Sequence, residues 1–223
     1  MGRKMPFNFS FKVGRFVRLF VLADLALLAG WGLINPIFAL FIIDKIQGAT
    51  VVTVGFSAAV YWIVKGAIQI PIANFLDKTP GEKDDFMVLI LGLVLAALSA
   101  FSFALVSEIW QLYAVQVIHA IAFGMYVPSW SGMFSRHLDK NHEALDWSLD
   151  STAMSFAAGI TGLLSGVVVK LFGFVMVFIL GGFFSLLSAA VIFFVPHIIF
   201  PQRKGRRGRV MVRDHKPITH VQD

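Results

Sequence analysis

Six long apolar segments occupy most of this 223-residue chain. Each is long enough to cross a hydrocarbon layer of about 30 Å at a helical rise of about 1.5 Å per residue. A soluble domain of this length would not need a chain that is 57% hydrophobic and only 14% charged. The sequence therefore predicts an all-α polytopic membrane bundle with six transmembrane helices. We place these at residues 18–43, 51–76, 86–106, 109–133, 150–170 and 173–200.

The basic residues distinguish the two sides of the membrane. Of the 19 lysines and arginines, sixteen fall in the termini and in loops that share one side. Lys45 and Lys170 fall on the other side, and Lys65 lies within the second helix. By the positive-inside rule we expect both termini to be cytoplasmic, in an integral protein of the cell (inner) membrane. The formal charge of +6 then reflects topology and contact with anionic membrane lipid, and we expect no nucleic-acid partner.

Short connections between the helices leave no room for a second folded domain. We divide the chain into a basic N-terminus (residues 1–17), a six-helix membrane domain (18–200) and a basic tail (201–223), which we expect to be disordered or to lie on lipid headgroups. The first segment is too long for a cleavable signal peptide and is expected to remain as an anchor. The loop at 134–149 is the longest, and the residues around its end suit a helix start: Asp146, Ser148, Asp150 and Ser151.

Polar residues are confined to some of the helices. The third and sixth contain no ionisable residue between Met87 and Val106 or between Phe174 and Val195, which predicts that they face lipid. In the first, second and fourth helices, polar and aromatic residues recur at spacings of three and four, so they share one face of each helix. These three helices are therefore predicted to line a common cavity. Its candidate residues are Asp24, Trp31, Asn35, Tyr61, Lys65, Gln69, Gln116, His119 and Tyr126.

Three ionisable residues lie away from the membrane surfaces: Asp24, Lys65 and His119. Each costs about 2.5–3.5 kcal/mol on insertion scales, so each needs a reason to be there. Asp24 and Lys65 could form a structural ion pair, Lys65 could extend to the headgroups, or the two could bind a substrate charge or a proton. His119 could hydrogen-bond a neighbouring helix, or serve as a cavity ligand or proton acceptor.

Asn35 and Pro36 interrupt the first helix. Proline supplies no N–H and clashes with the preceding turn, so a kink is predicted there. Asn35 is also a candidate for substrate contact.

The fifth helix carries a stripe of small side chains: Ser155, Gly159, Gly162 and Gly166. Such a stripe lets another helix backbone approach closely within lipid. It predicts a packing face, with gating or dimerisation as the alternative.

The loop after the second helix carries a family resemblance. The segment Asn74-Phe-Leu-Asp77-Lys78-Thr-Pro-Gly81-Glu-Lys83 resembles the Gly-x-x-x-Asp-Arg/Lys-x-Gly-Arg/Lys-Arg/Lys signature of the major facilitator superfamily, with Asn74 in place of the first glycine, one extra residue and Glu82 before Lys83. The stretch 126–136 and its continuation to Trp147 is similar to the connection between the fourth and fifth helices in that superfamily. By this resemblance the gating loop comprises Asp77, Lys78, Gly81 and Lys83.

The resemblance covers about residues 15–200, one six-helix half of a fold that normally has twelve helices. It implies two three-helix inverted repeats, a cavity lined by the first and fourth helices, and transport by rocking of one half against another. The missing half is then a second copy or a separate chain. The fourth helix lacks the family's Arg-x-x-x-Gly arginine and the fifth lacks its Gly-Pro pair, so neither proton coupling nor antiport is predicted.

A half-size transporter of a small solute is therefore the leading hypothesis. The alternatives are a non-transporting, partner-binding or regulatory membrane subunit, and a fragment of a full-length transporter. An enzyme is third, because the sequence has no His-Glu-x-x-His, Gly-x-Ser-x-Gly or phosphate-loop motif. With no cysteine there is no thiolate metal site, and we predict no metal and no cofactor. The aromatic residues would suit an amphipathic or sugar-like ligand, and the substrate stays open.

Overall fold

Helices account for nearly all of residues 13–194, the part of the chain that the computed structural model describes. Residues 1–12 and 195–223 lie outside it, and with them the predicted tail. The described residues contain no strand. In chain order the elements are α1 (Arg15–Ile34), the 3-10 turn η1 (Asn35–Ile37), α2 (Phe38–Lys45), α3 (Val51–Lys78), α4 (Lys83–Phe103), α5 (Ile109–Arg136), α6 (Glu143–Phe172) and α7 (Phe174–Phe193).

The predicted six spans are confirmed within the described residues, where six helices are long and apolar enough to cross a membrane. The first of these is the continuous unit Arg15–Lys45, which comprises α1, η1 and α2. The predicted interruption at Asn35 and Pro36 is also confirmed, because the α-helical pattern gives way to a 3-10 turn there. Pro36 occupies the first turn of that element, where its missing N–H is tolerated.

The predicted start of the fifth span at residue 150 is wrong. The helix α6 begins at Glu143, so Asp146 and Asp150 lie inside it and are buried. The chain turns earlier, at Asn141, whose φ is 65°. Asp146 Oδ2 accepts a hydrogen bond of 2.7 Å from the Asp139 backbone N–H, so this carboxylate organises the preceding loop and does not cap α6.

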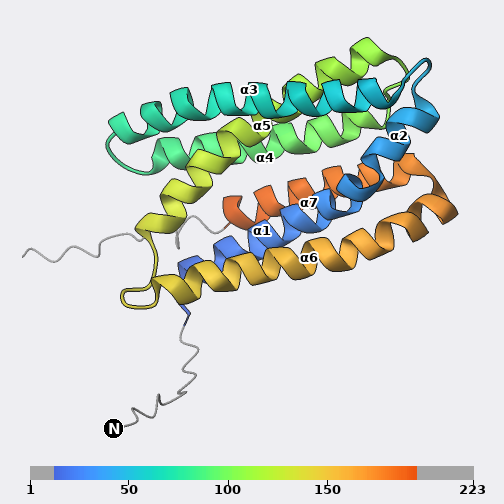
Figure 1. Cartoon of the computed structure of the whole chain (residues 1–223). Coiled ribbons are helices and arrows are strands. Elements are labelled where there is room, and N and C mark those ends of the chain that lie inside the picture. The colour runs from blue at the N-terminus through green and yellow to red at the C-terminus, as the bar shows by residue number, and fades with distance from the viewer. Residues whose placement is uncertain (1–12, 195–223) are drawn as a thin grey trace, which may run out of the picture.

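The helices pack as two groups of three (Figure 1). One group contains α3, α4 and α5, and the other contains α1, α6 and α7. Contact between α4 and α7 joins the two groups. The helix α1 packs along the last two helices and not along its sequence neighbours. The α3–α4 turn, the α5–α6 loop and the start of α1 gather at one end of the bundle, as an in-and-out threading requires.

Small residues allow the helices of the second group to approach closely. A Cβ atom on Gly30 of α1 would lie 2.9 Å from the backbone oxygen of Gly181 in α7. A Cβ on Gly32 would lie 2.3 Å from Thr161 Oγ1 and 3.0 Å from Ala158 Cα in α6. Any larger side chain would force these helices apart, so the two glycines set the spacing of the group.

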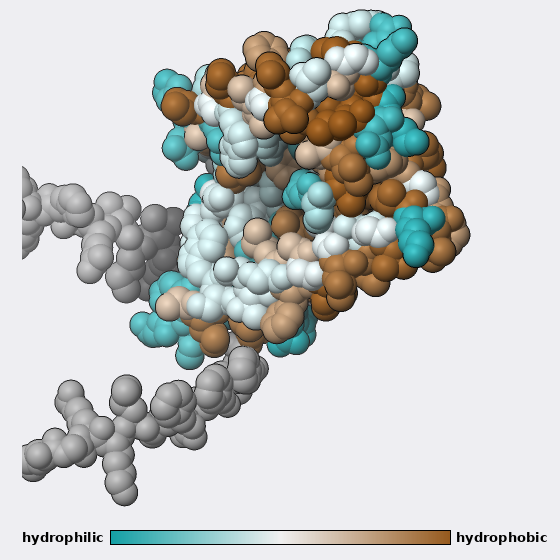
Figure 2. Space-filling model, turned by 45° about the vertical axis from the view of Figure 1, so that its right-hand side comes forward, coloured by the Kyte–Doolittle hydropathy of each residue, from teal (hydrophilic) through white to brown (hydrophobic). Residues whose placement is uncertain are grey.

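Burial is divided unevenly among the helices. In the most apolar 18-residue stretch of α3 and of α6, only 11% of the residues are buried. The corresponding share is 61% for the first span and 44% for α4 and α7. The predicted lipid-facing spans, α4 and α7, each bury one face against the other group and leave apolar residues such as Met87 and Phe183 exposed on the rest, while α3 and α6 are the most exposed of the described helices. Figure 2 shows paler, less hydrophobic atoms in the hollow between the two groups.

Candidate functional site

A pocket of about 440 Å³ lies between the first span, α3 and α5. Five predicted cavity residues line it: Trp31, Asn35, Tyr61, Gln116 and His119. The rest of its wall is mainly apolar and aromatic, with Leu28, Phe38, Trp62 and Phe123 among its members. The structure therefore brings together residues from three helices that the sequence pattern assigned to one cavity. Gln69, which was predicted with them, lies one turn beyond Lys65 on α3 and is not part of this lining.

The imidazole of His119 is held between two aromatic rings. It stacks on Trp31 with a centroid distance of 4.1 Å and an interplanar angle of 3°. On the other face it stacks on Tyr61 at 4.5 Å and 28°. The edge of Phe123 approaches the same ring at 5.1 Å. Both faces of the imidazole are thus covered, and its polar contacts are confined to the ring edge.

Gln116 fixes the role of one imidazole nitrogen. Its side-chain nitrogen donates to Ser57 Oγ at 2.9 Å and lies 3.4 Å from the Ser57 carbonyl oxygen. Its oxygen is then free to accept a hydrogen bond from His119 Nδ1, 3.0 Å away. In the neutral ring this leaves Nε2 as the hydrogen-bond acceptor.

The indole N–H of Trp31 has no hydrogen-bond partner within the described residues, although the side chain is only 4% exposed. A buried donor without an acceptor is unfavourable by about 1–3 kcal/mol. The Trp31 side chain is at the same time part of the pocket wall.

Lys65 and Asp24 do not form the ion pair that the sequence left open. The Lys65 ammonium lies over the rings of Trp62 and Tyr61, 4.7 and 5.6 Å from their centroids. Asp24 instead accepts a short hydrogen bond from the Tyr126 hydroxyl. The ion pairs of the described residues join neither group to the other, so each charge lacks an opposite charge at bonding distance.

A second carboxylate accompanies Asp24. Asp150 of α6 lies within electrostatic range of Asp24 and of Tyr126, and is 3% exposed. Its Oδ1 has no hydrogen-bond partner in the described part of the chain. We name Asp24, Tyr126 and Asp150 the acidic cluster. The sequence analysis missed Asp150 as a member because it assigned this residue to a helix start. The spacing of four residues between Asp146 and Asp150 was the available signal, because it places both on one face of a helix.

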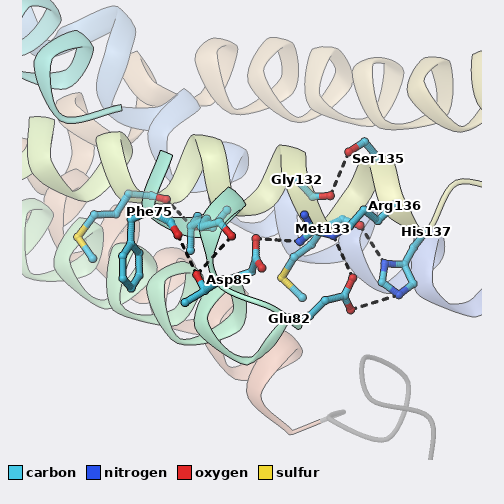
Figure 3. Close-up of polar contacts among 12 residues, drawn as sticks. Phe75, Glu82, Asp85, Gly132, Met133, Ser135, Arg136 and His137 are labelled. Carbon is cyan, nitrogen blue, oxygen red and sulfur yellow. Dashed lines mark hydrogen bonds and ion pairs between the residues drawn. The ribbon is translucent and has the colours of Figure 1, made fainter. Parts of the chain in front are cut away.

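Four side chains at the α3–α4 turn, the start of α4 and the end of α5 form ion pairs (Figure 3). The Arg136 guanidinium binds Asp85 Oδ1 at 2.8 Å and Glu82 Oε1 at 3.1 Å. His137 Nε2 lies 3.5 Å from the other oxygen of Glu82. We name Glu82, Asp85, Arg136 and His137 the Arg136 network. It joins the α3–α4 turn and the start of α4 to the end of α5.

The predicted gating loop lies beside this network but contributes none of its charges. Asp77 and Lys78 end α3 and are exposed, and neither has a side-chain partner among residues 13–194. Gly81 has a φ of 107°, which only glycine adopts readily, and Lys83 is the first residue of α4. Glu82 and Asp85 were missed because the signature drew attention to the loop and not to its acidic neighbours.

The small-residue stripe of α6 is only partly used by this chain. A Cβ atom on Gly162 would lie 3.6 Å from the Pro36 ring, an ordinary contact with the first span. A Cβ on Gly159 or on Gly166 would meet nothing within 4 Å. Ser155 is exposed and its hydroxyl donates to the Ser151 carbonyl oxygen within α6. Most of the stripe therefore remains open to another helix.

Among the described residues, no group of three or more histidine, aspartate or glutamate side chains could hold a metal ion. The chain matches the Major Facilitator Superfamily over residues 20–220. A search of curated proteins finds no match. Because the family match spans most of the sequence, the chain belongs to the Major Facilitator Superfamily. It is an integral membrane protein of a family that transports solutes and does not catalyse covalent chemistry.

Proposed function

We propose that this member of the Major Facilitator Superfamily moves a small solute by alternating access and is completed by a second six-helix half. The second half is another copy of this chain or a separate polypeptide. The observation that carries the proposal is the pocket between the first span, α3 and α5, which places the polar side chains of Asn35, Gln116 and His119 among aromatic rings and has as one wall α3, a helix with only 11% of its most apolar stretch buried. Polar groups facing lipid without a cover would be unfavourable.

The helices α3 and α6 carry the most exposed apolar faces of the described chain. On α3, Trp62, Ile63 and Ile70 are each more than 60% exposed. On α6, Phe156 and Leu163 are 66% and 80% exposed, and Gly159 and Gly166 have no neighbour. A second half seated on these faces would close the pocket and use the open stripe. In a two-fold symmetric dimer, α3 of each copy would meet α6 of the other.

The cytoplasmic ends of these two helices give the pairing a testable geometry. Asp77 at the end of α3 and Ser151, the ninth residue of α6, are both exposed. Asp150 is buried, so it would not oppose Asp77 across the interface.

The test uses the absence of native cysteine. Two differently tagged copies, one with Asp77→Cys and the other with Ser151→Cys, are expressed together and cross-linked in native membranes. We expect a heterotypic cross-link. The matched control is Met87→Cys with Phe193→Cys, exposed positions on α4 and α7 that should not meet. A strictly monomeric chain with no cross-link and no co-purifying six-helix partner would reject the half-transporter proposal and favour the regulatory subunit or the fragment.

We also propose that both termini are cytoplasmic and that the protein resides in the cell membrane, from the charge distribution alone. Cysteines introduced at Gln47 and Gln202 should be labelled from opposite sides of sealed cells. Labelling of both from outside would reject this topology.

A further inference from the structure

We propose that the pocket between α1, α3 and α5 binds an organic anion, with its carboxylate near Lys65 and the Trp31 indole N–H and its flat apolar body among the aromatic rings. This inference rests on the proposed transport function and names its substrate class. It is argued from three observations: the place of Lys65, the charges around it, and the shape and donors of the pocket.

Lys65 is too deep to serve as a membrane-surface anchor. It is the fifteenth residue of the 28-residue helix α3, near the middle of a hydrocarbon layer and about 15 Å from either surface. Its side chain does not extend towards the C-terminal end of α3. Instead the ammonium lies back over Trp62 and Tyr61, which precede it on the helix and line the pocket. The charge is therefore held beside the pocket.

No carboxylate neutralises this ammonium within the described residues. Its contacts are the two aromatic faces, which attract a cation but carry no net charge. The group that faces it from α5 is His119, which feels its field. The buried carboxylates Asp24 and Asp150 belong to the acidic cluster, and the ion pairs of the described residues do not include Lys65. A cation at this depth in a membrane is costly without an anion, and an anionic ligand would reduce that cost.

The pocket supplies a donor and a flat apolar lining for the rest of such a ligand. The Trp31 N–H is buried and has no acceptor among the described residues, and its side chain lines the pocket, so the proposal places a carboxylate oxygen where a small turn of the indole would let it donate. The rings of Trp62 and Phe123 and the side chain of Leu28 form apolar walls. The volume of about 440 Å³ falls in the range of small-molecule sites, roughly 300–1,000 Å³. A carboxylate attached to an aromatic or flat amphipathic body satisfies all three features.

A cationic ligand is less favoured by the same geometry. Neither Asp24 nor Lys65 is among the residues that line the pocket, but the Lys65 ammonium lies over two that are, Trp62 and Tyr61, whereas one Asp24 oxygen is occupied by the Tyr126 hydroxyl. A cation in the pocket would lie beside the Lys65 ammonium, which repels it. Reversed charge selectivity would therefore contradict the proposal directly.

The test compares three probes that share one ring system: 2-naphthoate, 2-naphthamide and 2-naphthylmethylammonium. Binding to the full chain in zwitterionic lipid nanodiscs is measured by titration calorimetry, with empty nanodiscs subtracted. We expect 2-naphthoate to bind at least about tenfold more tightly than the amide, since hydrogen bonds to charged groups are worth about 1.5–3 kcal/mol. The ammonium probe should bind most weakly.

Variants assign the selectivity to named groups. Lys65→Met should weaken 2-naphthoate binding at least about tenfold and leave the amide nearly unchanged, whereas Lys65→Arg should retain the preference. Trp31→Phe keeps an aromatic ring and removes the N–H, and should weaken the carboxylate about fivefold. The matched control is Lys45→Met, because Lys45 also lies over a ring, that of Phe174 at 5.8 Å, but outside the pocket. It should have no effect.

Equal binding of the three probes, preference for the ammonium, no measurable binding, or an unchanged Lys65→Met variant would each overturn the anion site. Cross-linking of the same samples separates this outcome from failure of the proposed function. Naphthoate binding in a chain that does not pair would retain the anion site and reject the half-transporter. Pairing of two chains without a preference for the anionic probe would retain the half-transporter and overturn the anion site.

Discussion

The Arg136 network and the acidic cluster lie in the same helix bundle but differ in whether their charges are paired. In the network, Arg136 binds the carboxylates of both Glu82 and Asp85. In the acidic cluster, Asp24 and Asp150 are each 3% exposed, lie within electrostatic range of each other and have no cation at bonding distance in the described residues. The first arrangement has a structural explanation in its own contacts, and the second does not.

The two arrangements should have opposite effects on the free energy of unfolding. A partly exposed ion pair that bridges the start of α4 and the end of α5 holds two helices together. Two buried carboxylates that repel each other oppose folding unless a proton or another cation offsets them. Neutralising a charge in the Arg136 network should therefore destabilise the fold, whereas neutralising one in the acidic cluster should not.

The largest effect is expected at Arg136. Arg136→Met removes two ion-pair contacts and leaves the buried carboxylate of Asp85, which is 2% exposed, without its cation. Breaking a buried pair costs about 3–5 kcal/mol, and because the Arg136 side chain is 41% exposed we expect about 2–3 kcal/mol. The measurement is the free energy of unfolding in lipid by steric trapping.

Two controls identify the cause of that loss. Arg136→Lys should recover part of the stability, because it keeps the charge but not the two-armed geometry. Asp85→Asn combined with Arg136→Met should be less harmful than the sum of the single changes, since the stranded carboxylate is gone. Strict additivity would show that Arg136 and Asp85 are not energetically coupled and would contradict this account of the Arg136 network.

A smaller loss is expected from Tyr126→Phe. The change removes the hydroxyl that donates to Asp24 and leaves that oxygen without a donor among the described residues. An unsatisfied buried acceptor costs about 1–2 kcal/mol here, in the range for such groups. The ring itself, which packs 5.9 Å from Phe123, is retained. In the Asp24→Asn background the same change should cost less, and an equal cost would mean that the hydrogen bond to Asp24 contributes little.

Much of the fold could be predicted from local sequence, because a hydrocarbon layer imposes a length and a polarity on each span. The six spans and the interruption at Pro36 follow from these rules. The start of α6 does not, because Asp146 and Asp150 have the residue type of helix caps and only the turn at Asn141 reveals that the helix has already begun. The exposure of α3 and α6 depends on which helices pack together, which hydropathy does not encode.

The candidate site could be predicted in part for a similar reason. Trp31, Tyr61 and His119 each belong to a row of polar and aromatic residues at helical spacing, one row on each of three spans. These three spans converge on one pocket. Partners within a site are a different matter. Asp24 and Lys65 have opposite charges and lie at compatible depths, yet Asp24 accepts a hydrogen bond from Tyr126 and the Lys65 ammonium lies over aromatic rings. Depth along each helix can be counted from sequence, but rotation about the helix axis is set by tertiary packing.

The smallest effect on stability is expected from Asp24→Asn and Asp150→Asn, and it provides the sharpest test of the comparison. The amide that Asp24→Asn introduces can still accept the Tyr126 hydrogen bond through its oxygen, so the neutral variant keeps that contact and loses the repulsion. We expect each single change to alter the free energy of unfolding by less than about 1 kcal/mol, or to increase it. Because the repulsion between the two carboxylates can be removed only once, the double variant should gain less than the sum of the single gains, with a coupling of about 0.5–1 kcal/mol. Steric trapping of the two single variants and the double variant measures that coupling. A loss as large as that of Arg136→Met would show instead that an undetected cation neutralises the acidic cluster, and the distinction between the two regions would fail.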